Sequence, residues 1–174
     1  MEARDGTWPA LRWSFLMRVQ YVCLESLHHR ARAALALACD GAVDEAERRK
    51  LLRMAERDAA RMKWHRMPWG DALANLTQAG IAGARGNRTG AMSLLRAAKA
   101  GFEATDMALY AAAARRRRGQ LTEGKDGRSL VDAVGLWMAG QNIRNPERMT
   151  AMLAPGDWNG GSEAAPRSRA GEFH

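Results

Sequence analysis

Residues 67–103, MPWGDALANLTQAGIAGARGNRTGAMSLLRAAKAGFE, decide the fold of this chain. On both sides of a tight connection at residues 86–89, apolar or small residues recur three or four positions apart, which is typical of a helix with one buried face. Small faces let two helices approach closely, so the stretch predicts an antiparallel helical hairpin. The face of the helix before the connection consists of Trp69, Leu73, Leu76, Ala79, Gly80 and Gly83. The face of the helix after it consists of Ala91, Leu94, Leu95, Ala98 and Phe102.

The same spacing extends upstream. We expect a long helix over residues 11–39, since Pro9 suits a first helical turn and Gly41 tolerates the left-handed conformation that ends a helix. A second helix follows over residues 44–65, with one apolar face and one charged face. These two helices predict a second hairpin in front of the first.

Downstream, three further helices are expected. Thr105 or Asp106 should cap a fifth helix that finishes in the arginine run of residues 115–118, where cations complement the helix dipole. A polar link at residues 123–127 precedes a sixth helix, and a short seventh occupies residues 145–153. The chain therefore predicts three hairpins and one short terminal helix.

Composition favours helices over β-sheets. The chain of 174 residues contains 34 alanines but only 7 valines and isoleucines together, and β-sheets favour the branched residues that are scarce here. We expect an all-α helical domain over residues 9–156, a flexible N-terminus at residues 1–8 and a disordered tail at residues 157–174 with Trp158 as its anchor.

The hairpins repeat with a regular rhythm. Their second helices begin near Val43, Arg88 and Arg128, and spacings of about 45 and 40 residues are typical of helical repeats. The middle hairpin has small and apolar residues where a tetratricopeptide repeat has them, whereas the usual Trp and Tyr of the first helix are out of register. The pattern predicts a tetratricopeptide-like array of about three antiparallel hairpins.

Three phrases carry a resemblance to a known family. They are Met67-Pro-Trp69, DMALYAAAARRR at residues 106–117 and NPERMTAMLAPG at residues 145–156, with RARAALA at residues 30–36 as a weaker fourth. These phrases resemble the C-terminal helical region of large multidomain bacterial serine/threonine protein kinases, a kind abundant in myxobacteria. In that family a kinase domain precedes the helices, which are regarded as an interaction or sensing region.

The chain lacks the motifs of the kinase domain itself. It contains no glycine-rich phosphate loop, no His-Arg-Asp catalytic loop and no Asp-Phe-Gly triplet, and phosphoryl transfer needs a base, metal ligands and a phosphate clamp together. We therefore expect a non-catalytic, cytoplasmic interaction or regulatory module that binds a protein or peptide on the face of its stacked hairpins. The alternatives are a basic nucleic-acid-binding helical protein and a truncated gene fragment without an independent role.

The candidate partner-binding residues are Trp69, Tyr110, Arg115, Arg116, Arg117 and Arg118. Four consecutive helical residues sweep about 300° around the axis, so the arginines cannot all face one phosphate strand. The favoured interpretation of the run is a solvated helix end, and an anionic partner surface is the alternative. Trp69, Tyr110 and Trp137 each lie on an apolar stripe, which favours packing over recognition. The net charge of +8 divides evenly between residues 1–66 and 67–174, so no polarised patch is expected.

No cofactor, metal or catalytic site is predicted. His28 and His29 are adjacent, and only Glu25 stands four positions from His29, which favours an ordinary helix-face ion pair over a metal site. Cys23 and Cys39 lie 16 positions apart in one helix, about 24 Å along its axis, which is too far for a disulfide. No apolar run is long enough for a membrane span.

Overall fold

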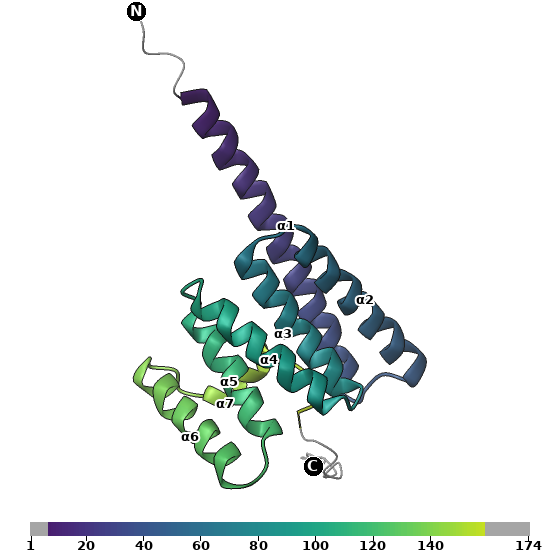
Figure 1. Ribbon diagram of the computed structural model, residues 1–174. Coiled ribbons are helices and arrows are strands. Elements are labelled where there is room, and N and C mark those ends of the chain that lie inside the picture. The colour runs from purple at the N-terminus through teal and green to yellow at the C-terminus, as the bar shows by residue number, and fades with distance from the viewer. Residues whose placement is uncertain (1–6, 159–174) are drawn as a thin grey trace, which may run out of the picture.

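The computed structural model describes the backbone of residues 7–158 and side chains from residue 20 onward. Over this part of the chain the secondary structure is entirely α-helical, and consecutive helices lie side by side (Figure 1). The N-terminal half of the first helix extends beyond the other helices (Figure 1). The helices are α1 (Thr7–Cys39), α2 (Glu45–Trp64), α3 (Pro68–Ala84), α4 (Arg88–Glu103), α5 (Ala108–Leu121), α6 (Gly124–Gly140) and α7 (Pro146–Leu153).

The helices pair as three antiparallel hairpins, α1 with α2, α3 with α4 and α5 with α6. Neighbouring hairpins also touch, through α2 with α3 and α4 with α5, while α7 packs on α5 and α6. The prediction of an all-α array of three hairpins and a short terminal helix is confirmed. Among the described residues, no helix is both long and apolar enough to span a bilayer.

Side chains cap three of the helices. Asp44 accepts a hydrogen bond from the backbone N–H of Glu47 (2.8 Å), and Asn87 and Asn145 do the same for α4 and α7. Such caps satisfy backbone donors that the first helical turn leaves without partners. The predicted cap of α5 is wrong, because Met107 stands at that position without a side-chain bond, and Asp106 has a positive φ of 56°.

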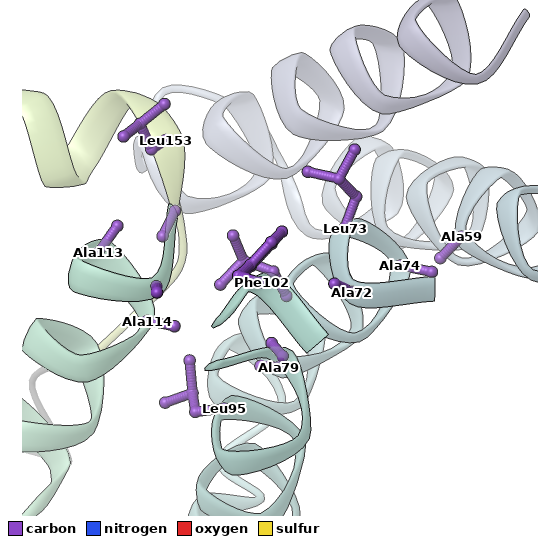
Figure 2. Close-up of a cluster of buried hydrophobic side chains, with 14 of the residues drawn as sticks. Ala59, Ala72, Leu73, Ala74, Ala79, Leu95, Phe102, Ala113, Ala114 and Leu153 are labelled. Carbon is purple, nitrogen blue, oxygen red and sulfur yellow. The ribbon is translucent and has the colours of Figure 1, made fainter. Parts of the chain in front are cut away.

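The core lies between the hairpins and is built largely from alanine, leucine and one phenylalanine. Phe102 is fully buried near the centre, and its ring lies 5.2 Å from that of Tyr110 on α5. Figure 2 shows side chains from α2 to α5 and α7 converging on this point. The small residues of α3 permit this close packing, as the sequence predicted.

Glycines allow α5 and α6 to approach closely. The predicted end of α5 and the predicted start of α6 are both wrong. A methyl group on Gly119 would stand 2.9 Å from Val131 Cγ2 and 3.0 Å from the carbonyl oxygen of Gly127. Gly119 is therefore a packing residue inside α5, which continues to Leu121 instead of ending at Arg118. Helix α6 likewise begins at Gly124, within the stretch predicted to be a link.

After α7 the chain turns back across the first helices of the hairpins. This return segment, residues 154–158, lies on α3 so closely that methyl groups on Gly80 and Gly83 would stand 2.6 Å from the carbonyl oxygens of Pro155 and Asp157. Its last residue, Trp158, is 3% exposed and is buried in the core, as expected of an anchor. The remainder of the predicted tail, residues 159–174, and the N-terminal residues 1–6 lie outside the described part of the chain.

Candidate functional site

The return segment covers part of one face of the helical array. We call this face, formed by α1, α3 and α5, the first-helix face. Leu35 of α1, Gly80 and Gly83 of α3 and Arg117 of α5 all lie against residues 154–158. The chain's own backbone therefore occupies the middle of the first-helix face.

Arg117 holds the return segment in place. Its Nε donates a hydrogen bond to the carbonyl oxygen of Ala154 (2.8 Å), and its guanidinium carbon lies 5.4 Å from the ring centroid of Trp158. Both contacts are favourable for a cation, and the hydrogen bond is charge-assisted. Burial, with a smaller contribution from Arg116, lowers the pKa of Arg117 from 12.5 to about 10.

The four arginines of the run have different environments, and the interpretation as a solvated helix end is wrong for Arg117. Arg117 is only 8% exposed, and Arg116 donates a hydrogen bond to the carbonyl oxygen of Val131 on α6 (3.2 Å). Arg118 is partly exposed, and Arg115 is exposed. Only Arg118 lies in the last turn, because α5 continues to Leu121.

Arg115 lines an open cleft between α4, α5 and α6. The cleft has a volume of about 220 Å³, and its floor is formed by alanines of α5. Lys99 and Glu103 form the α4 wall and pair with each other at 2.6 Å, while the α6 wall carries an indole ring. The lining residues are Lys99, Glu103, Ala108, Ala111, Ala112, Arg115, Val134 and Trp137.

Two of the lining groups have capacity left for a ligand. Arg115 forms no ion pair or side-chain hydrogen bond within the described residues, in contrast to Arg116 and Arg117. Trp137 is 40% exposed, so it does not belong to the core. An unpaired guanidinium beside a half-exposed indole can bind a carboxylate and an apolar group at the same time.

Trp69 and Tyr110, the two aromatic candidates, are not in this cleft. Trp69 is partly buried at the start of α3, where its ring lies 5.4 Å from that of Tyr21. Tyr110 packs on Phe102, and its hydroxyl lies 3.4 Å from Nε2 of His28. Burial raises the pKa of Tyr110. The structure therefore does not bring these residues together with Arg115.

The histidines of α1 have separate roles. His29 pairs with Glu25 at 3.1 Å, which confirms the predicted helix-face pair. His28 is 2% exposed, and its Nδ1 has no hydrogen-bond partner. Burial, with smaller effects of Arg32 and His29, lowers its pKa from 6.5 to about 3.

The described residues can be searched for metal-ligand clusters and for disulfides. This part of the chain contains no group of three or more His, Cys, Asp or Glu side chains that could hold a metal ion. Cys23 and Cys39 are free thiols, as expected from their separation along α1. Burial raises the pKa of Cys39, the more covered of the two.

Only one part of the cleft, the face of α5, could be predicted from the sequence. Ala108, Ala111 or Ala112, and Arg115 are three or four positions apart, so one face of α5 could be drawn in advance. Nothing in that spacing indicates that α4 and α6 stand far enough apart to leave this face uncovered. No protein-family model, curated protein or solved structure matches this chain.

Proposed function

We propose that this chain is a non-catalytic protein-interaction or regulatory module, and that its partner docks in the cleft between α4 and α6. The observation that carries the proposal is that Arg115, which has no ion pair or side-chain hydrogen bond among the described residues, and half-exposed Trp137 line one cleft together with three alanines of α5. The expected ligand is a peptide segment with one acidic side chain near one apolar or aromatic side chain.

The chemistry of the cleft supports such a ligand. Tryptophan and arginine are enriched among the residues that dominate protein interfaces, because each combines a large contact area with a directed polar group. The alanine floor lets a ligand backbone or side chain approach α5 closely. The ion pair of Lys99 with Glu103 gives one wall both signs of charge, which would orient a ligand that carries a carboxylate toward Arg115.

The sequence resemblance points in the same direction. The helical region of the bacterial serine/threonine kinases that this chain resembles is regarded as an interaction or sensing region, and one resembling phrase, residues 106–117, contains the α5 floor of the cleft and Arg115. We therefore propose for this chain the role of that region, separate from kinase chemistry.

The proposal can be tested by selecting peptides from a displayed library of random peptides on the immobilised full-length chain. We expect enrichment of an acidic residue within a few positions of an apolar or aromatic one. Arg115→Glu should shift the selected charge from acidic to basic, because the wall of the cleft then repels carboxylates. Trp137→Ala should weaken the selected peptides at least about tenfold, as expected for a central interface residue.

Leu136→Ala is the matched control for Trp137→Ala, since Leu136 is a neighbouring exposed residue of α6 that does not line the cleft. It should leave the affinity of the selected peptides unchanged. Peptides that bind Arg115→Glu and Trp137→Ala as tightly as they bind the unaltered chain would show that the cleft is not the docking site.

A further inference from the structure

The outward face of α2 carries a row of cations that ends in a tryptophan. At about 100° per residue, all members of the row lie within about 40° of the direction of Arg57. Each of them is exposed to solvent. We call this row the α2 stripe, and it consists of Lys50, Arg53, Arg57, Arg61 and Trp64.

The positive charge of the stripe is almost uncompensated. Lys50 pairs with Glu47 at the edge of the row (3.3 Å), whereas Arg53, Arg57 and Arg61 form no ion pair within the described residues. Cations four positions apart on a helix repel one another. The surface along the stripe therefore has a positive electrostatic potential.

The remaining carboxylates of α2 are directed elsewhere. Glu45 pairs with Arg48 and Arg49 in the first turn, and Glu56 forms a bidentate pair with Arg85 of the α3–α4 connection. Asp58 is buried against Arg30 of α1. Summing the charge over halves of the chain conceals this separation, so the expectation that no polarised patch exists is wrong.

Trp64 gives the stripe a second kind of binding group. It is 80% exposed, although an indole of this size gains strongly from burial in a folded chain. Its nearest aromatic neighbour, His65, meets it edge-on with ring centroids 5.6 Å apart. The indole is therefore accessible to a planar group from outside the chain.

We propose that the α2 stripe binds single-stranded nucleic acid, with phosphates on the row of cations and an unpaired base stacked on Trp64. Proteins that bind single strands combine cations along the backbone with aromatic side chains under the bases. Arg53, Arg57 and Arg61 follow one another at steps of about 6 Å, and the row from Lys50 to Trp64 is about 21 Å long. This length suits a short site of on the order of four nucleotides.

An unpaired strand fits the stripe better than an acidic protein or a duplex. Protein interfaces have a desolvated apolar core, whereas the exposed apolar residues beside the cations are small, namely Ala46 and Ala60. A duplex would leave Trp64 without a base to stack on, because paired bases are enclosed in the helix. The stripe lies on α2, away from the α4–α6 cleft, so this inference does not depend on the proposed function.

The test is fluorescence anisotropy of a labelled 12-nucleotide oligodeoxythymidylate titrated with the full-length chain. Four phosphate contacts predict a slope of about −2.8 for log affinity against log salt, at about 0.7 per contact on a single strand. The affinity should therefore fall about 50-fold between 50 and 200 mM salt. A labelled duplex of the same length should bind more weakly than the single strand.

Removing the cations should remove this salt dependence. The combined variant Arg53→Gln, Arg57→Gln and Arg61→Gln leaves one stripe cation, so the slope should fall in magnitude by about 2. At 50 mM salt the affinity should drop at least tenfold. Because all three side chains are exposed and form no ion pair in the part of the chain that the structure describes, the variant should keep the helical circular dichroism of the unaltered chain.

A control variant removes the same net charge elsewhere. Arg96, Arg128 and Arg144 are exposed and form no ion pair within the described residues, and changing all three to Gln should alter the affinity less than twofold. Equal weakening by the control and the stripe variant would overturn the proposal, since it would show attraction to net charge alone.

Trp64 is tested by two substitutions. Trp64→Ala should weaken single-strand binding by at least about fivefold, because base–aromatic stacking is lost, whereas Trp64→Phe should keep most of the affinity. Three outcomes would overturn the proposal: no oligonucleotide binding at 50 mM salt, an unchanged affinity of Trp64→Ala, or binding of an acidic helical peptide in place of the oligonucleotide.

Discussion

Acid should destabilise the fold through one buried histidine. His28 lies beneath the return segment, where it shares a small cavity with Leu153 and Pro155, and only its Nε2 is near a polar partner, the hydroxyl of Tyr110. Burial lowers the pKa of His28 from 6.5 to about 3, so the folded chain holds this imidazole neutral where the unfolded chain protonates it. The free energy of unfolding should therefore decrease as the pH falls below 6.5.

The size of this loss follows from the two pKa values. Between pH 6.5 and pH 5 the unfolded state binds a proton that the folded state does not, and each pH unit costs about 1.4 kcal/mol. His28 should thus account for about 2 kcal/mol of lost stability at pH 5 relative to pH 8. The loss should saturate below pH 3, where the folded state also takes up the proton.

Urea denaturation at pH 8 and pH 5, followed by far-ultraviolet circular dichroism, measures the effect for the unaltered chain and for His28→Gln. Other groups that titrate in this range are common to both proteins, so the difference between their pH-dependent losses isolates His28. We expect that difference to be about 2 kcal/mol. If both proteins lost equal stability between the two pH values, the assignment of a neutral buried imidazole would be refuted.

Two further predictions concern packing and ion pairs. Gly80→Ala should cost about 1–3 kcal/mol by forcing the return segment off α3, whereas Gly135→Ala, which has room for a methyl group inside α6, should stabilise by about 0.5–1 kcal/mol; urea titrations measure both. Arg30→Met should destabilise by about 2 kcal/mol because it leaves the buried carboxylate of Asp58 unpaired, while Arg85→Met, at an exposed pair, should cost under about 1 kcal/mol in the same assay.

Periodicity predicted the elements of this fold well because the stripes it finds are the surfaces that the helices bury. Leu73, Leu76 and Ala79 were expected on one face of α3, and all three are buried. Helix starts with a short polar side chain, such as Asp44, were also predictable, since the cap acts within one turn. Local signals fail at α5, whose Gly119 continues the helix because α6 packs against it.

Which of the arginines would be buried and which exposed could not be predicted from the sequence. Arg115, Arg116 and Arg117 are consecutive and chemically identical, so only the elements around α5 decide which one is buried and which one faces the cleft. The partner of Arg117 is a backbone carbonyl 37 positions away, and a carbonyl group is present at every residue. Trp137 was misassigned for the same reason, since its stripe on α6 extends beyond the elements that pack against it.

The return segment changes which surfaces of the array remain for partners. The small residues Gly80 and Gly83 of α3 were expected to serve helix packing. Gly80 does so, since a methyl group there would stand 2.5 Å from Leu35 of α1, and both glycines also admit the chain's own residues 154–158. Since that backbone occupies the first-helix face, an incoming partner would have to displace contacts such as the hydrogen bond from Arg117 to Ala154. The groups proposed to bind partners, namely Arg115 and Trp137 in the cleft and the α2 stripe, lie on other surfaces and require no such displacement. Recognition by this chain should therefore proceed without unfolding of the return segment.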